Sequence, residues 1–159
     1  MIGVQIKDRA LQQEIGRALK RNPKKTAEVV TRCILDLAGR SAQLAPIESG
    51  DLRNNCHGRI GLSTVFTNQA PTGAVVPPST RIEGEVGYSL PYALRQHEDL
   101  SLRHDRTDGY VIKSGPRQGQ TVNMVAGGQA KYLEEPFLAQ RGRYLEMLKR
   151  IPQEVLDED

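Results

Sequence analysis

The sequence contains no tryptophan, and aromatic residues of all kinds make up only 4% of its 159 residues. The core must therefore be built mainly from Leu, Ile, Val and Ala, which gives an adequate but thin core. In a chain with long polar stretches, a thin core favours oligomerisation, because neighbouring subunits can order segments that a monomer cannot. The length is typical of one domain, so we expect a single domain over residues 1–156 and an acidic tail over residues 157–159.

Long apolar runs are also missing. No run approaches the roughly 20 residues that a membrane span needs, and residues 1–7 lack the apolar stretch of a secretory signal. We therefore expect a soluble protein that is cytoplasmic at synthesis and has no membrane partner. Cysteine is scarce as well: Cys33 and Cys56 fall in different predicted elements, and the cytosol would keep both thiols reduced.

Positive charge is concentrated in the first part of the chain. Residues 1–70 carry 11 basic and 6 acidic side chains, whereas residues 71–159 carry 11 and 13. The densest basic group consists of Lys20, Arg21, Lys24 and Lys25. This group is a candidate for contact with nucleic-acid phosphates rather than bases. Because no aromatic residue interleaves it, the pattern favours a solvated junction between helices.

Apolar spacing predicts three helices. The first is capped by Asp8 and runs to about Arg21, after a short strand over residues 4–6. The second starts near Pro23 and ends before Pro46, because proline cannot continue a helix. The third starts after the Glu-Pro pair at 135–136 and continues to Pro152.

The stretch between the second and third helices predicts antiparallel strands. Residues 81–88 alternate apolar and polar side chains, as a half-buried strand does. A strand from Leu52 to Ile60 or Leu62 is a weaker prediction because its alternation is poor, and residues 67–78 are predicted to be a loop.

Residues 101–129 are predicted to form a long polar hairpin arm, strand-like only at 110–112 and 122–125. The order of the elements predicts an α+β fold. In this fold a small antiparallel sheet packs against a long helix, with N- and C-terminal helices and the long polar hairpin arm.

One cluster of potential metal ligands stands out. His97, Glu98 and Asp99 precede His104 and Asp105, and imidazole and carboxylate groups hold zinc or manganese for hydrolysis. The HExxH spacing, which places two imidazoles on one helical face, is absent. The pattern favours a polar loop, and a metal-dependent nuclease remains a second hypothesis.

Other chemical motifs are weaker still. No Gly-x-x-x-x-Gly-Lys-Ser/Thr loop occurs, so nucleotide binding is unsupported. Cys56 and His57 would be a nucleophile and a base, but adjacent residues of a strand point to opposite faces. Cys33 lies between apolar positions of the second helix and is predicted to be a small buried thiol.

Three separated motifs resemble those of one family. Ala-Pro-Ile-Glu-Ser-Gly-Asp-Leu-Arg lies at 45–53, Val-Gly-Tyr-Ser-Leu-Pro-Tyr-Ala at 86–93 and Pro-Phe-Leu at 136–138. Their order and spacing resemble the minor capsid or tail-completion proteins, which join head and tail in the neck of long-tailed bacteriophages. The matching positions are Ala45, Pro46, Ser49, Gly50, Leu52, Arg53, Gly87, Pro91, Tyr92, Ala93, Glu98, Pro136, Phe137 and Leu138.

The resemblance implies a structural virion protein of the neck or tail, which completes the tail and helps to join it to the head. It implies no enzymatic activity, no catalytic or metal-binding residue and no cofactor. Such a protein is expected to form a homo-oligomeric ring through which DNA passes. Its expected neighbours are the connector or stopper, the tail terminator and the tail tube, and its expected location is the virion, after assembly in the host cytoplasm.

Under this interpretation the polar arm is an assembly element. Its candidate contact residues are Arg103, Arg106, Tyr110, Lys113 and Arg117. Within the same class, the alternative is a tail terminator or another minor tail protein. Outside it, the alternatives are the metal-dependent nuclease and a DNA-binding accessory protein that uses the basic group at residues 20–25.

The first motif also has a physical interpretation. Pro46 ends the long helix, and Gly50 permits a positive φ. Leu52 is then expected to enter the core while Arg53 points outward. We therefore predict that the segment 45–53 is a corner between helix and strand that stabilises the fold and does not contact a substrate.

Overall fold

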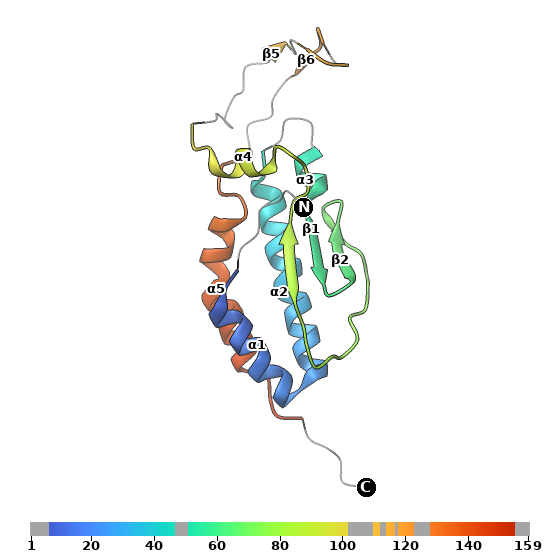
Figure 1. Ribbon diagram of the computed structural model, residues 1–159, viewed down its shortest axis with the longest axis vertical. Coiled ribbons are helices and arrows are strands. Elements are labelled where there is room, and N and C mark those ends of the chain that lie inside the picture. Colours follow the sequence, from blue (N-terminus) through green and yellow to red (C-terminus); the bar gives the residue numbers. More distant parts are fainter. Residues whose placement is uncertain are drawn as a thin grey trace.

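A computed structural model describes residues 7–46, 51–101, 110–111, 114–116, 118–122 and 128–154. The predicted strand at 4–6, the acidic tail and several motif and arm positions lie outside these residues. Within them the chain is α+β, with five helices and a small antiparallel sheet of four strands, as the sequence predicts. Figure 1 shows an elongated molecule in which α1, α2 and α5 run along the long axis beside the sheet.

Side-chain caps define the first two helices. α1 spans Arg9–Arg21, and the Asp8 carboxylate accepts a hydrogen bond from the Leu11 N–H at 2.8 Å. Asn22 ends α1 and also caps α2, which spans Pro23–Leu44, by accepting from the Lys25 N–H at 3.0 Å. The remaining helices are α3 Asp51–Asn55, α4 Ala93–Glu98 and α5 Glu134–Lys149. The three long helices are therefore confirmed. None of the described helices has the length and apolarity needed to cross a membrane.

The four-stranded sheet has the order β3-β2-β1-β4, and all neighbouring strands in it are antiparallel. Its strands are β1 His57–Ile60, β2 Ser63–Thr67, β3 Ala70–Pro71 and β4 Gly84–Gly87. The predicted strand at 81–88 is confirmed in β4, and Ile82, Val86 and Tyr88 are buried as its alternation requires. In the arm, β5 Tyr110–Val111 pairs with β6 Thr121–Val122 as an antiparallel hairpin.

Two of the predictions for this region are wrong. The strand predicted from Leu52 is instead the short helix α3, and strand structure begins only at His57. The loop predicted over 67–78 contains the short edge strand β3, which extends the β1–β2 hairpin. In both cases a contact with a distant or neighbouring element overrides a weak local pattern.

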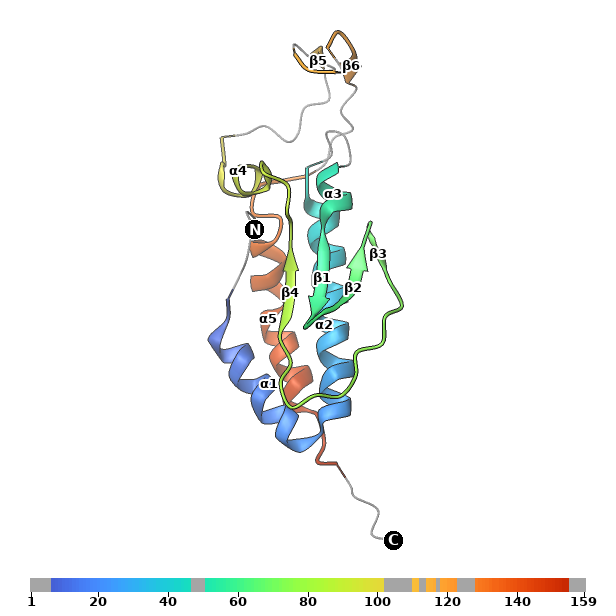
Figure 2. The same ribbon diagram turned by 45° about the vertical axis from the view of Figure 1, so that its right-hand side comes forward.

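The core lies on both sides of α2, which packs against the sheet on one side and against α1 and α5 on another (Figure 2). The helix comes close to the sheet because two glycines face it. A Cβ atom added at Gly58 would lie 2.7 Å from Cγ2 of Ile34, and one added at Gly84 would lie 2.8 Å from Cδ1 of the same residue. The Ile34 side chain therefore fills the space that side chains at both glycines would need.

This packing gives a prediction about Gly58 and Gly84. Each glycine-to-alanine substitution should destabilise the fold by about 1–3 kcal/mol, because it overpacks the helix–sheet contact. Ile34→Val, which removes only Cδ1, should relieve the cost of Gly84→Ala but not that of Gly58→Ala, which contacts Cγ2. Urea unfolding of the single and double variants measures both couplings. Equal relief at the two glycines would contradict this geometry.

Candidate functional site

The motif positions that the structure describes gather at one end of the molecule. There the C-terminus of α2, the helices α3 and α4 and the N-terminus of α5 meet (Figure 1). The arm leaves this end after Ser101, and Gly128 at its other end lies against Pro46. We call this region, residues 41–46, 51–56, 87–99 and 128–138, the arm base. Ser49, Gly50, Arg103, Arg106, Lys113 and Arg117 lie outside the described residues, as does the side chain of Tyr110.

The corner after α2 is held by Arg53. Its Nε donates a hydrogen bond to the Ala45 carbonyl at 2.8 Å, and its Nη2 donates to the Gln43 carbonyl at 2.7 Å. These are carbonyls at the C-terminus of α2, where a guanidinium also meets the negative end of the helix dipole. The prediction that Arg53 points outward is therefore wrong, because the side chain folds back onto the helix. Leu52 is buried, as predicted.

The chain between β4 and α4 is fixed by Asn55, the last residue of α3. Its Oδ1 accepts hydrogen bonds from the N–H groups of Ser89 and Leu90 at 2.6 and 3.1 Å. Its Nδ2 donates to the Ser89 hydroxyl at 2.9 Å. This clamp sets the turn at Pro91, after which Ala93 is completely buried at the start of α4.

Behind this clamp, a buried row of polar and aromatic side chains crosses the arm base. The Ser41 and Tyr88 hydroxyls lie 2.8 Å apart and share a hydrogen bond. The Tyr88 ring meets the Tyr132 ring edge to face at 5.0 Å, and the Tyr132 ring meets His97 in the same way at 5.0 Å. The Tyr132 hydroxyl donates to the Ala93 carbonyl at 2.7 Å. The row joins α2, the residue that follows β4, α4 and the segment before α5.

His97 is 1% exposed, and both of its ring nitrogens have partners. Its Nε2 accepts a hydrogen bond from the Glu134 N–H in the first turn of α5 at 3.2 Å. Its Nδ1 lies 2.6 Å from Oε1 of Glu98. Since Nε2 accepts, the proton belongs on Nδ1, which then donates to the Glu98 carboxylate. His97 therefore acts as an external cap on α5.

Lys131 places a positive charge beside the carboxylates of Glu98 and Glu134. His97, Glu98 and Glu134 bring potential metal-ligand atoms within 4.8 Å of one another. The Lys131 ammonium, however, bonds to the Glu98 carboxylate and lies 2.9 Å from the Glu134 carboxylate. Its hydrogen bond, followed by that of His97, lowers the pKa of Glu98. Of the predicted metal cluster, His97 and Glu98 thus lie beside a lysine, whereas the Asp99 carboxylate accepts a hydrogen bond from the Ser101 N–H at 3.0 Å. His104 and Asp105 lie outside the described residues.

The end of the arm returns through a space that only glycine fits. Gly128 has a φ of +101°, and a Cβ atom there would lie 2.5 Å from the Pro46 Cα. After it, the Gln129 N–H donates to the Leu44 carbonyl at 2.9 Å and the Lys131 N–H donates to the His97 carbonyl at 2.8 Å. Pro46 of the first motif therefore lies against the segment that follows the arm.

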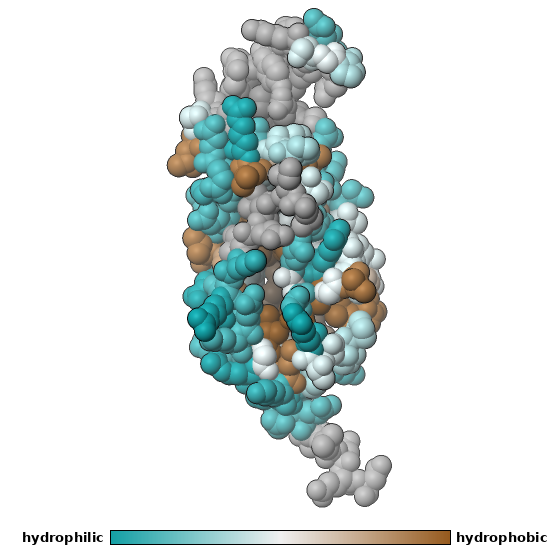
Figure 3. All heavy atoms as spheres, in the orientation of Figure 1, coloured by the Kyte–Doolittle hydropathy of each residue, from teal (hydrophilic) through white to brown (hydrophobic). Residues whose placement is uncertain are grey.

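The surface of the arm base carries apolar side chains. Pro136 and Phe137 are buried in the first turn of α5, but Leu138 is 60% exposed. On and beside α4, Tyr92 is 43%, Leu94 46% and Leu100 77% exposed. Figure 3 shows hydrophobic groups at this edge of the molecule, over α4 and the start of α5, and another group at the opposite edge beside the loop after β3. The other large apolar residues that are exposed in the described part of the chain are Leu62, in the turn between β1 and β2, and Val75, in the loop after β3.

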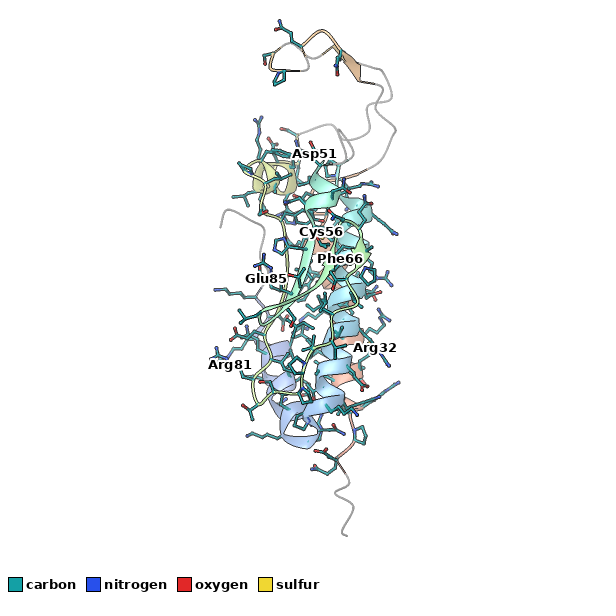
Figure 4. The ribbon with its side chains drawn as sticks, turned by 90° about the vertical axis from the view of Figure 1, so that its right-hand side faces the viewer. Arg32, Asp51, Cys56, Phe66, Arg81 and Glu85 are labelled. Atoms are coloured by element: carbon teal, nitrogen blue, oxygen red, sulfur yellow. The ribbon has the colours of Figure 1, made fainter. Side chains whose placement is uncertain are left out.

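The cysteines lie in environments that suppress reactivity. Cys56 is completely buried, its Sγ lies 3.6 Å from the Ala38 carbonyl, and burial raises its pKa to about 11. Figure 4 shows Cys56 among the side chains of the packed body, whereas Glu85 lies on the side of the sheet away from α2. His57 hydrogen-bonds to Glu85 at 3.4 Å, so it faces away from Cys56. Cys33 is half-buried in α2, and burial raises its pKa to about 11.

The basic group at residues 20–25 is partly engaged in the fold. Arg21 donates to the Leu148 carbonyl at 2.9 Å and to the Ile151 carbonyl at 3.2 Å, at the C-terminus of α5. Lys25 pairs with Glu28 at 3.1 Å on the surface. The prediction of a junction between helices therefore agrees with the position of Arg21.

Sequence reasoning missed the residues that complete the arm base. Asn55, Lys131 and Tyr132 carry no local signal, because each acts on a partner more than 30 positions away in the chain. The signal that was available is Gly128, a glycine at the end of the arm.

No protein-family model, no curated protein and no solved structure matches the chain. The resemblance carried by the sequence motifs therefore stays a prediction.

His97→Ala tests the structural role of the buried imidazole. It should cost about 2–4 kcal/mol of stability, because it leaves a cavity beside Tyr132 and the Glu134 N–H without its acceptor. Glu98→Gln, which keeps an acceptor for the Nδ1 proton, is the matched control and should cost much less. Thermal unfolding measures both, and elemental analysis of the same samples tests the metal hypothesis. Stoichiometric zinc or manganese in the unmodified protein, lost in His97→Ala, would contradict the structural role.

Proposed function

We propose that the chain is a structural protein of the neck or tail of a long-tailed bacteriophage, acting as a subunit of a ring that completes the tail and joins it to the head. The observation that supports this most is the convergence of the described motif positions on the arm base. Residues from α2, α3, α4 and α5, separated in the sequence, meet where the arm leaves the body.

The chemistry of the arm base favours architecture over catalysis. Arg53 caps α2, Asn55 clamps the turn before α4, and His97 caps α5. Each of these groups bonds to backbone of a neighbouring element, which is how a fold fixes the direction of a projecting segment. In this proposal the arm base fixes the direction in which the hairpin of β5 and β6 projects from the body.

The exposed apolar side chains suit a ring contact of the head-to-tail kind. One group surrounds α4 and the start of α5, and a second lies near the opposite edge of the molecule. Contacts between two different surfaces of identical subunits generate a closed ring when the rotation between subunits closes. Apolar residues such as Leu100 and Leu138 would then be covered by the next subunit. The arm would contact that subunit or a neighbouring neck or tail protein.

Removing the arm tests its part in assembly. We expect a variant with residues 107–120 replaced by a short Gly-Ser linker to keep the unfolding temperature of the full chain, because the arm base is formed by other residues. The same variant should fail to form rings, as measured by light scattering and negative-stain electron microscopy. Unfolding of the variant would place the arm in the core and contradict the assembly role.

Deleting the gene in the phage or prophage that encodes the chain tests the joining role. The expected result is that heads and tails accumulate separately, because the junction between them is incomplete. Electron microscopy of lysates provides the measurement, and expression of the protein from a plasmid is the control. Normal virions in the deletion would overturn the proposal, and tails of irregular length would favour a tail terminator.

A further inference from the structure

The outer edge of β4 has backbone groups that need a partner. β4 is at the end of the sheet order, so no described strand pairs with it on that side. The Gly61 N–H donates to the Glu83 carbonyl at 2.9 Å, which makes these two a hydrogen-bonded pair of the antiparallel ladder. The pairing then alternates along β4, so the N–H and C=O groups of Gly84 and Val86 point away from β1.

Val86 makes this edge unusual because the residue is only 8% exposed. A buried backbone N–H or C=O without a partner costs free energy comparable to a lost hydrogen bond. An exposed edge strand normally satisfies such groups with water. Here the low exposure of Val86 favours a protein segment over water as the partner.

Beside this edge lies a groove between α1 and β4. Its floor is apolar and includes Leu11, Ile15, Val30, Ile34, Ile82 and Val86. Cys33 also lines it. The rim on the β4 side carries Glu83 and Glu85, and Lys7 lines the end at which the described chain begins. An apolar floor beside an open strand edge is the arrangement that binds an extended peptide by β-strand addition.

We propose that residues 1–6 of the same chain occupy this groove as a fifth strand, paired with the outer edge of β4. Ile2, Val4 and Ile6 alternate with Gly3 and Gln5, which is the period of a strand with one buried face. The apolar three face the floor of the groove, and Gln5 shares the outer face of the sheet with the glutamates of β4. This inference does not depend on the proposed function.

The length of residues 1–6 and their attachment to Lys7 favour this segment as the occupant of the groove. Six extended residues span about 20 Å, and the four residues of β4 span about 13 Å, so the segment is long enough to cover the edge. Lys7 already lies at the groove, so the local concentration of the preceding residues there is high and a second copy competes poorly. Lys7 also brings a positive charge to the rim that holds Glu83 and Glu85.

Val4→Asp and Gln5→Asp test the proposal as a matched pair, because they add the same charge at adjacent positions on opposite faces. Amide hydrogen exchange of the full-length protein, read by NMR, is the measurement. Val4→Asp should lower the protection of the Gly84 and Val86 amides about tenfold or more, because a charge replaces a buried apolar side chain. Gln5→Asp should leave both amides protected. The Glu85 and Gly87 amides, which bond to β1, should not change in either variant and show that the sheet remains folded.

Three outcomes would overturn the proposal. Gly84 and Val86 amides that exchange as fast as free amides in the unmodified protein would mean that no strand covers the edge. Equal effects of the two substitutions would mean that the segment has no buried face. Protection that is lost on dilution to a monomer would mean that the strand comes from a second copy. Alkylation of Cys33 by N-ethylmaleimide gives an independent measurement, and it should be faster in Val4→Asp while Cys56 stays unmodified.

Discussion

Ile34 of α2 lies over two glycines of the sheet, Gly58 and Gly84, and this contact sets the distance between the helix and the sheet. α2 in turn contacts α1, α3, α5 and three of the strands, so its position determines theirs. Because α2 ends at Leu44, the same contact also determines the position in space of the corner that begins at Ala45. The place of the arm base is therefore a consequence of how helix and sheet pack, and not of any signal within the arm itself.

The arm base illustrates how a buried histidine beside carboxylates can serve a structural purpose. Nε2 of His97 accepts a hydrogen bond from the first turn of α5, and Nδ1 bonds to Glu98. The ammonium of Lys131 balances the negative charges of Glu98 and Glu134. Groups with this composition would also suit a metal ion, so composition alone does not separate the two roles. What favours the structural role is that each group bonds to an element that the arm base must hold in place.

The helices were predictable because their ends are encoded locally. The Asp8 and Asn22 caps and the prolines at 23 and 46 act within a few residues of the ends that they define. α3 was not predictable, because Arg53 within it bonds to carbonyls of α2 that lie eight and ten positions earlier. β2 was missed because its sequence does not alternate: the adjacent residues Val65 and Phe66 are both buried. The pairing of β1 with β2 is irregular at the same place, between Gly58 and Arg59. In the arm base the motif residues were found, but partners such as Lys131 were not.

The two edges of the sheet constrain how copies of this protein can assemble. At one edge, β3 contains Pro71, which has no N–H to offer to another strand. At the other edge, a fifth strand formed by residues 1–6 would cover the outward groups of Gly84 and Val86. With both edges closed in this proposed way, subunits would not associate by extending the sheet. In the proposed ring, association would then use side-chain surfaces and the arm, and the ring closes when the rotation between subunits closes.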